Sequence, residues 1–393
     1  MRFVHRPRRS VVLAALLGCL GASAATGISG RAQPVAAGVP NGRDYETSFR
    51  PYAVSSVWNR KVSTHPKILA NSAAIVAAEF PNGRNPEAVR GTEAGRFDYS
   101  HPLYFADDRD PVVKLVCKQY CGRYPATMHI PARARPAGGT DAHIAVVQPD
   151  GTEIDAWAVY GSPGSDPAWK APHDVQTRDW RNGDTLSAGN ISVCGNFRTG
   201  SGLAPPPGAT AANFCLRGGI VTANELISGR IEHALFVGGE CAIGSQFPST
   251  GSTQQCTSGV GPPLGGRVWY DVPCEVTQSN SSLHPWEKAV LCALNVYGGY
   301  FGDNGSGGSH YTGGIEPMLE SEEPWRDWDG EGYASPFAPL ASQGWSVTII
   351  PDAVSGRPGR RWVYDEGRPW NPRGVDFAEH IHWLAACSAQ GSC

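Results

Sequence analysis

A predicted β-hairpin constrains the fold of this chain more than any other feature. The stretch Ala137 to Tyr160, AGGTDAHIAVVQPDGTEIDAWAVY, contains two alternating apolar runs joined by Gln-Pro-Asp-Gly. A side-chain period of two is typical of strands, and Pro-Asp-Gly is typical of a turn. We therefore expect antiparallel strands at about 143–148 and 152–160, with the rest of a sheet built around them.

The remaining chain favours turns and short strands over long helices. Its 48 Gly and 32 Pro make up about a fifth of the 393 residues. Apolar or alternating runs bounded by turn residues predict further strands. They are expected at 103–105, 111–116, 127–130, 191–193, 231–237, 267–272 and 345–350. We predict a mostly β protein, a β-sandwich or jelly roll with a few short helices and long disulfide-closed loops.

A few segments have helical patterns. Thr222 and Glu225 have the spacing of a capping box, and Gly229 ends the short helix that they would begin. The other helices are expected at 66–80, 285–297 and 375–386.

The chain begins with the pattern of an export signal. Four arginines precede an apolar run over 11–20, and Ala22-Ser23-Ala24 fits the small-residue cleavage rule. We predict a signal peptide at 1–24, a flexible lead-in at 25–47 and a single β-rich domain at 48–393. The alternative is a lipid anchor on Cys19, in Leu-Leu-Gly-Cys. Either reading predicts a secreted or periplasmic protein.

The cysteines indicate disulfide bonds. Of the eleven, Cys19 lies in the signal segment, which leaves an even number as expected in an oxidising compartment. Irregular spacing and the absence of a C-x-x-C pair argue against zinc. Closure of neighbouring cysteines gives the pairs Cys117–Cys121, Cys194–Cys215, Cys241–Cys256, Cys274–Cys292 and Cys387–Cys393.

Charge and motifs exclude several partners. Without the four arginines of the signal, 29 basic residues remain against 36 acidic ones, a net charge of −7. No basic stripe for nucleic acid and no apolar run long enough for a transmembrane segment occurs. Nucleotide motifs, G-x-S-x-G and H-E-x-x-H are also absent. We expect no cofactor and a monomer.

Asp141 and His143 are the first candidate site residues. Two positions apart on a strand, they would point the same way, and His233 on another strand could join them. Three interpretations are open. The three residues could bind a metal ion, His143 could be a general base oriented by Asp141, or the pair could be a structural hydrogen bond. His233 alone fits a core histidine bonded to Asp141 or Asp155.

Two further carboxylates suit glycoside chemistry. Glycosidic cleavage by water uses two carboxyl groups on opposite sides of the bond. Asp141, Asp155 and Asp303 are the candidates, although Asp303 in Asp-Asn-Gly also fits a simple turn. A lyase would instead use a His or Tyr base, for which the candidates are Tyr297, Tyr300 and Tyr311, with His310 and Asn304.

Aromatic side chains in polar surroundings suit the apolar faces of sugar rings. An alternative is that these rings form small cores within the loops. The predicted sugar-binding residues are Trp157, Trp169, Trp180, Tyr300, Trp325 and Trp328.

Four segments together resemble a group of secreted bacterial β-sandwich-like proteins. They are SSVWNRKV at 55–62, GGTDAHIAV at 138–146, GGIVTANELISGRIEHAL at 218–235, and 297–305 with Asp-Asn-Gly. The group has no settled activity, so the resemblance implies an extracellular role and supports the choice of Asp141, His143, His233 and Asp303.

We predict a secreted carbohydrate-active enzyme that cleaves glycosidic bonds of a polysaccharide or oligosaccharide. Hydrolysis is favoured, with Asp141 and Asp303 as acid and base or nucleophile. The alternatives are a polysaccharide lyase, a non-catalytic carbohydrate-binding or envelope protein, and a metal-dependent oxidoreductase at Asp141, His143 and His233.

Overall fold

A computed structural model describes residues 50–80, 99–137, 141–160, 179–253, 255–304, 314–325, 335–350, 359–364 and 377–390. The chain divides into two compact units, Met1–Ala36 and Ala37–Cys393, and every described residue lies in the second unit. The predicted signal peptide at 1–24, Cys19 and the predicted lead-in at 25–47 lie outside the described residues.

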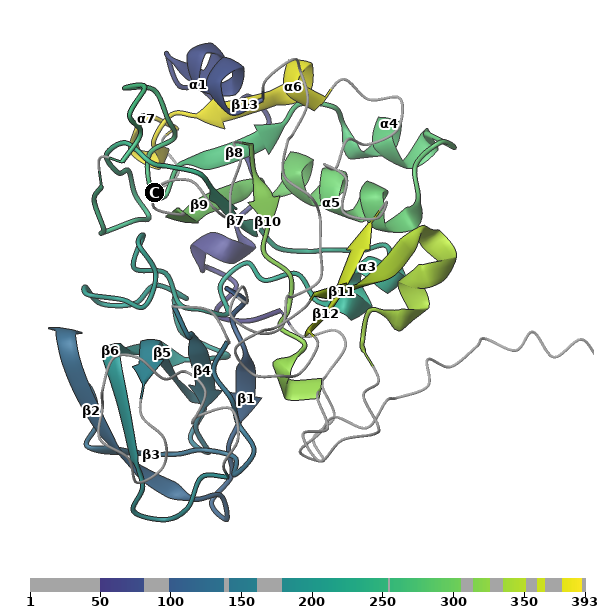
Figure 1. The fold of residues 1–393 in the computed structure, drawn as a ribbon. Coiled ribbons are helices and arrows are strands. Elements are labelled where there is room, and N and C mark those ends of the chain that lie inside the picture. Colours follow the sequence, from purple (N-terminus) through teal and green to yellow (C-terminus); the bar gives the residue numbers. More distant parts are fainter. Residues whose placement is uncertain are drawn as a thin grey trace, which may run out of the picture. The chain divides into compact units, whose positions relative to one another are not determined.

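The described chain forms strands in three sheets, together with short helices (Figure 1). The strands are β1 (Leu103–Phe105), β2 (Val112–Cys121), β3 (Thr127–His129), β4 (Ile144–Val147), β5 (Thr152–Tyr160), β6 (Thr185–Asn196), β7 (Leu235–Gly239), β8 (Arg267–Tyr270), β9 (Gly299–Asn304), β10 (Glu316–Pro317), β11 (Trp345–Ile350), β12 (Gly359–Tyr364) and β13 (Ile381–Leu384). The helices are α1 (Ser72–Glu79), α3 (Ala223–Ser228), α4 (Cys274–Ser279), α5 (Pro285–Val296), α6 (Phe377–His380) and α7 (Cys387–Gln390), with short 3-10 helices η1 (Val57–Asn59), η4 (Glu323–Trp325) and η5 (Ala338–Gln343).

The predicted hairpin lies in a six-stranded sheet with the order β1-β4-β5-β6-β2-β3. Strands β4 and β5 pair antiparallel, with Ala145 opposite Asp155. Gly151 in their turn has a φ of 85°, which glycine adopts without strain. All four residues of β4 are buried, as expected for a strand covered on both faces. The hairpin is confirmed, and β4 also pairs in parallel with β1.

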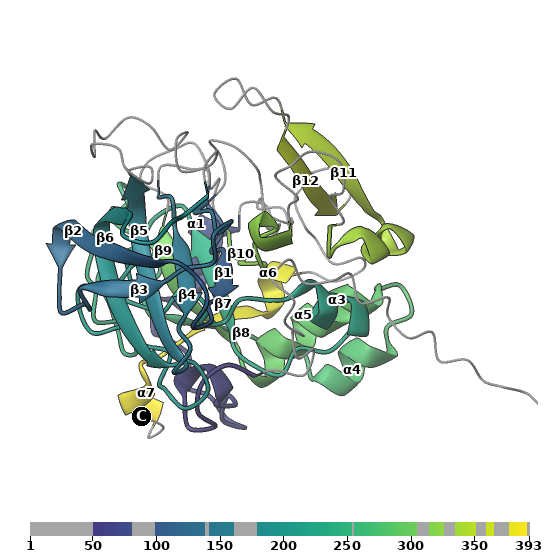
Figure 2. The same cartoon turned by 90° about the horizontal axis from the view of Figure 1, so that it is seen from below.

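A second sheet has the order β10-β7-β9-β8-β13, and a two-stranded ribbon joins β11 to β12. Helix α5 contacts α3, α4 and β8, and this helical group is seen together in Figure 2. Helix α5 begins with Pro285 and a capping box between His284 and Glu287, so its first backbone amides are satisfied. Strands β7 and β9 pair in parallel.

Trp58 lies at the centre of the larger apolar core. Its indole is 0% exposed and packs edge-on against Phe214 and Tyr300, with ring centroids 5.1 and 5.5 Å away. The indole N–H donates to the carbonyl of Gly202 at 3.0 Å. A Cβ at Gly218 would lie 2.5 Å from the indole, so glycine is required there for this packing.

The predicted C-terminal helix at 375–386 is wrong over most of its length. Only α6 is helical before the chain enters β13, which pairs antiparallel with β8. Ile381 and Trp383 alternate into the core at 1% and 0% exposure. The segment forms a strand instead of a helix because pairing with the edge of β8 satisfies its backbone and buries the side chains of Ile381 and Trp383.

Other boundaries differ by a few residues. The predicted strand 231–237 begins only at Leu235, and the predicted helix 66–80 is limited to α1. The capping box is confirmed, since Thr222 and Glu225 bond reciprocally and Gly229 ends α3 with a φ of 70°.

Four predicted disulfides are confirmed; the fifth involves Cys393, which lies outside the described residues. The confirmed bonds are Cys117–Cys121, Cys194–Cys215, Cys241–Cys256 and Cys274–Cys292. The described residues thus form a strand-rich protein with two mixed sheets and short helices. The packing of these sheets as a sandwich or jelly roll remains a prediction.

Candidate functional site

Three of the predicted catalytic residues line one cavity. Asp141, His143 and Asp303 surround a space of about 760 Å³, together with Trp157. Asp141 and His143 come from the segment before β4, Trp157 from β5 and Asp303 from β9. Residues of both larger sheets therefore meet at this cavity, where Asp303 joins Asp141 and His143 but His233 does not.

The geometry that brings Asp141 and His143 together is different from the one expected. Both residues precede β4 rather than lying on it, so strand alternation does not align them. Ala142 between them has a φ of 38°, and Ala158 in β5 has a φ of 50°. Such values are costly for residues other than glycine and often occur at functional sites. The strained backbone lies beside the side chains that line the cavity.

Asp141 is held by the second strand of the hairpin. Its carboxylate accepts a hydrogen bond from the indole N–H of Trp157 at 3.1 Å. Its carbonyl accepts from the N–H of Ala158 at 2.6 Å. One aromatic side chain thus both lines the cavity and orients the carboxylate next to it.

Asp303 is a carboxyl group of the cavity whose pKa is raised. Burial, and then the negative charge of Asp141, raise its pKa to about 7, although backbone N–H groups of Asn304 and Ala211 oppose the shift. The Asn304 N–H donates to its carboxylate at 2.8 Å. Asp303 follows a register shift in the pairing of β7 with β9, between Val237 and Gly238. A bulge of this kind re-aims a side chain.

His143 is neutral and has a defined tautomer. The carbonyl of Ala209 can only accept, so the Nε2–H of His143 donates to it at 3.2 Å. Burial lowers the pKa of His143 to about 4. The Nδ1 atom is buried and has no hydrogen-bond partner within the described part of the chain. His143 therefore lines the cavity while one of its ring nitrogens keeps a buried lone pair without a hydrogen bond.

His101 is a cavity residue that sequence reasoning missed. Its ring packs edge-on against His143, with centroids 4.7 Å apart, and its Nδ1 donates to the carbonyl of Leu216 at 2.8 Å. Burial, followed by the nearby His143, lowers the pKa of His101 to about 3. It follows Ser100 in an irregular segment before β1, where no motif identifies it.

His233 does not join this site, so its predicted catalytic and metal roles are corrected. Its Nε2 pairs with a carboxylate oxygen of Glu225 at 3.0 Å, and its Nδ1 donates to the carbonyl of Ala234 at 2.8 Å. Burial is the largest single influence and raises the pKa of Glu225, but the charge and hydrogen bond of His233, the Thr222 N–H and the charge of Arg217 together outweigh it, so the pKa is lowered. The partner of this core histidine is Glu225, rather than Asp141 or Asp155.

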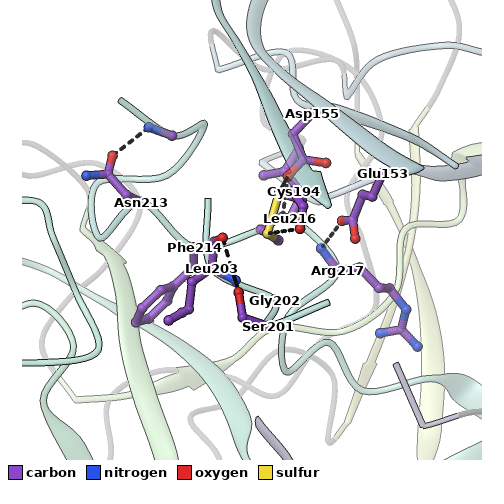
Figure 3. The surroundings of a disulfide bond; sticks show 12 residues. Glu153, Asp155, Cys194, Ser201, Gly202, Leu203, Asn213, Phe214, Leu216 and Arg217 are labelled. Atoms are coloured by element: carbon purple, nitrogen blue, oxygen red, sulfur yellow. Dashed lines mark hydrogen bonds between the residues drawn. A yellow bond between two sulfur atoms is a disulfide. The ribbon is translucent and has the colours of Figure 1, made fainter. Parts of the chain in front are cut away.

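Asp155 is also outside the cavity, which corrects its place among the catalytic candidates. It is 0% exposed and lies beside the Cys194–Cys215 disulfide, where it accepts from the N–H of Leu216 at 2.8 Å (Figure 3). Burial, and then the charge of Glu153, raise its pKa well above the ordinary value. No substrate reaches this carboxyl group.

The described residues contain no preformed metal site at Asp141, His143 and His233. The one group of three metal-type side chains within reach of each other is Asp155 with Cys194 and Cys215. These two sulfurs form a disulfide, so they are not thiolates that could bind a metal.

The predicted sugar-binding aromatics separate into different environments. Trp157 lines the cavity. Trp180 is 1% exposed and donates to the carbonyl of Ala134, and Tyr300 is 6% exposed against Trp58. Their rings are buried in the protein core and cannot stack on a sugar. Trp325 ends η4 and is not among the lining residues, while Trp169 and Trp328 lie outside the described residues.

Tyr120 and Asn190 also line the cavity and were not identified from the sequence. Tyr120 is 60% exposed, and its ring centroid lies 5.9 Å from that of Trp157. The sequence signal that could have identified Tyr120 is its position between Cys117 and Cys121. A disulfide across so short a segment tends to expose the side chains between its cysteines.

Comparison with protein-family models found no match, and comparisons with curated proteins and with solved structures found no significant match. The resemblance to secreted bacterial proteins therefore stays a prediction. Among the described helices, none combines the length and the apolar character needed to cross a membrane.

Proposed function

We propose that this protein is a secreted glycoside hydrolase acting on a neutral polysaccharide or oligosaccharide. The observation that supports this most directly is the pair Asp141 and Asp303 on one cavity, where burial and Asp141 raise the pKa of Asp303 to about 7. Two carboxyl groups of which one retains its proton provide the acid and the base that glycosidic cleavage needs.

In the proposed mechanism, Asp303 is the general acid. Its proton passes to the glycosidic oxygen as the bond from that oxygen to the anomeric carbon breaks. Asp141, oriented by the Trp157 indole, then serves in one of two roles. It takes a proton from the water that attacks the anomeric carbon, or it attacks that carbon itself and water later releases the sugar. A separation of about 5 to 5.5 Å between the carboxyl groups favours direct attack, and a larger one favours water activation.

His143 has a binding role in this scheme. His143 lines the cavity, and its unprotonated, buried Nδ1 has no hydrogen-bond partner among the described residues. A sugar hydroxyl that donates to Nδ1 would satisfy this buried acceptor, which otherwise costs about 1 to 3 kcal/mol. The proposed substrate therefore presents a hydroxyl donor at that wall.

The second candidate function is polysaccharide β-elimination. The neutral His143, with its lone pair on Nδ1, favours this reading because a lyase needs an unprotonated base. However, a uronic acid would bring its own carboxylate next to Asp141 and Asp303, and like charges repel. Hydrolysis of an uncharged glycan avoids this repulsion.

A screen of polysaccharides for newly formed chain ends tests the proposal. We expect new reducing ends from a neutral glycan, without the ultraviolet absorbance of unsaturated ends. Asp141→Asn and Asp303→Asn should abolish the release, while Asp155→Asn, a buried carboxyl outside the cavity, serves as the matched control. Unsaturated ends from a uronate polymer would establish the lyase instead. Binding without any new chain ends would establish a carbohydrate-binding protein.

A further inference from the structure

Tyr120 occupies an unusual place beside the proposed catalytic carboxylates. It is 60% exposed although its ring contacts Trp157, and both residues line the cavity. Large exposed aromatic side chains at a cavity rim are typical of ligand contacts rather than of core packing. The reason for the exposure lies in the strand that carries Tyr120.

Three side chains lie in one row across three strands. In the registers of the first sheet, Tyr120 of β2 is opposite Asn190 of β6, and Asn190 is opposite Trp157 of β5. The Asn190 amide donates to the carbonyls of Tyr120 and Pro207. The row continues to Asp141 through the Trp157 indole N–H. An aromatic ring, an amide, a second ring and a carboxylate thus follow one another along the cavity.

A bulge in β2 places Tyr120 in this row. Cys117 pairs with Ala188 and Tyr120 with Asn190, so β2 advances by three residues while β6 advances by two. In a regular strand, residues three apart face opposite sides. The extra residue re-aims the strand that follows it. The Cys117–Cys121 disulfide spans this same irregular segment.

Gly189 makes room for the second ring. A Cβ at this position would lie 2.7 Å from the Trp157 ring, closer than real Cβ contacts allow. The absence of a side chain at Gly189 therefore lets the Trp157 indole lie against β6. The position of the Tyr120 ring thus depends on the bulge in β2, and the position of the Trp157 ring depends on the absence of a side chain at Gly189.

We propose that Tyr120 is a substrate-positioning residue that forms, with Trp157, an aromatic platform for a sugar ring next to Asp141, and that the Cys117–Cys121 disulfide holds this platform in place. The platform deepens the hydrolase proposal and rests on it for the identity of the site. It selects glycans whose rings expose an apolar C–H face and carry no charge.

The test separates binding from catalysis. Wild-type protein and variants are run by affinity electrophoresis through gels that contain mixed-linkage β-glucan, galactomannan, arabinan or pullulan, with polygalacturonate as the anionic member. KM and kcat are then measured on any polysaccharide that yields new chain ends. We expect wild-type protein to be retarded by at least one neutral glycan. Tyr120→Ala should weaken this binding and raise KM about tenfold, equivalent to about 1.4 kcal/mol, with kcat changed less than twofold.

Matched variants exclude a general structural effect. Tyr120→Phe keeps the ring and should behave as wild type. The double variant Cys117→Ser/Cys121→Ser should reproduce most of the loss seen in Tyr120→Ala. The control double variant Cys274→Ser/Cys292→Ser removes a disulfide between α4 and α5, away from the cavity lining, and should leave KM unchanged. Thermal melting shows whether each variant is folded.

The outcomes distinguish this inference from the proposed function. If neutral glycans bind and Tyr120→Ala weakens binding, but no glycan is cleaved, the platform stands and the hydrolase proposal fails. If cleavage occurs and Tyr120→Ala leaves KM and binding unchanged, the platform is overturned and the hydrolase proposal stands. Retardation by polygalacturonate alone, or by none of the five polymers, also overturns the platform.

Discussion

Two pairs of carboxyl groups in this protein can be compared, one at a cavity and one buried inside the protein. Asp141 and Asp303 line a cavity. Glu153 and Asp155 are both 0% exposed, beside the Cys194–Cys215 disulfide (Figure 3). Burial raises the pKa of Asp303 in the first pair and of both carboxyl groups in the second. A raised pKa therefore does not by itself distinguish a site from a structural network.

The two pairs differ in their access to a cavity, since only Asp141 and Asp303 are among the residues that line it. The buried pair accepts hydrogen bonds from the Tyr52 hydroxyl at 2.7 Å and from the N–H groups of Leu216 and Arg217 at 2.8 and 3.3 Å. Protein donors thus reach both oxygens of Glu153 and the Oδ2 atom of Asp155, while Asp155 Oδ1 is buried without a hydrogen-bond partner among the described residues. The cavity pair adjoins His143, whose Nδ1 has no partner within the described residues. An accessible carboxyl group beside an unsatisfied acceptor is the stronger indication of function.

Two histidines repeat the same contrast. His143 and His233 are each 2% exposed. The Nδ1 of His233 donates to the Ala234 carbonyl, and its Nε2 lies 3.0 Å from a Glu225 carboxylate oxygen in an ion-pair contact that lacks hydrogen-bond geometry. His143 has a partner at Nε2 and no charged group in contact with Nδ1 among the described residues. Equal burial thus gives a structural ion pair in one place and a candidate ligand contact in the other.

The largest expected effect separates the two carboxyl pairs by activity. Asp303→Asn removes the proposed proton donor and should lower kcat about a thousandfold, the usual scale for loss of an acid catalyst. Asp155→Asn preserves the shape of a buried group outside the cavity and should change kcat less than threefold. Initial rates of reducing-end release measure both. Equal losses in the two variants would contradict the division drawn between the pairs.

The two histidines should differ in stability. His233→Ala leaves the carboxylate of Glu225 without its ion-pair partner in a mostly buried position, which should lower the free energy of unfolding by about 3 kcal/mol. His143→Ala breaks one hydrogen bond to a carbonyl and should cost about 1 kcal/mol in bonding, while it weakens substrate binding. Urea denaturation and KM measurements compare the variants. A larger loss of stability in His143→Ala than in His233→Ala would reverse the assignment.

The pH dependence of activity tests the proton on Asp303. Its pKa is raised to about 7, and the protonated form is the one proposed to act. We therefore expect kcat/KM to fall about tenfold per pH unit above pH 7. Asp155→Asn should show the same fall of kcat/KM above pH 7. A rate that stays constant from pH 6 to 9 would remove Asp303 from the role of acid.

The raised pKa of Asp303 also makes the free energy of unfolding depend on pH. Because folding raises the pKa of Asp303 from 3.8 to about 7, the folded state binds this proton more tightly. Its stabilisation is complete below about pH 4 and is lost as pH rises to about 7. Asp303→Asn should remove this contribution to the slope, measured as the change in urea midpoint from pH 4 to 8. An unaltered slope in the variant would show that Asp303 titrates normally.

The smallest expected effect concerns the donor to the buried pair. Tyr52→Phe removes the hydroxyl that donates to Glu153 and should lower the free energy of unfolding by about 1 kcal/mol, the scale of a buried hydrogen bond. Activity should be unchanged because Tyr52 does not line the cavity. Reduced kcat at full folding would mean that the buried pair communicates with the site.

Patterns among residues close in the chain predict the local structure well. The hairpin follows from alternation and from the Pro-Asp-Gly turn, and β1 lies where predicted, at Leu103–Phe105. The capping box of α3 and four disulfides also follow from short spacings. These features depend on residues close in the chain, where backbone geometry and the entropy of loop closure allow few arrangements.

Which distant residues meet depends on how the separate segments pack. In the folded protein, Asp303 and Asp141 line one cavity. His233 pairs with Glu225, and Asp155 is buried beside a disulfide. The bulge before Tyr120 and the positive φ of Ala142 were equally invisible in the sequence pattern. Candidate residue types can be chosen from local chemistry, but access and partnership depend on how separate segments pack. The alternation of apolar residues and the spacing of motifs along the chain do not specify which distant segments come into contact.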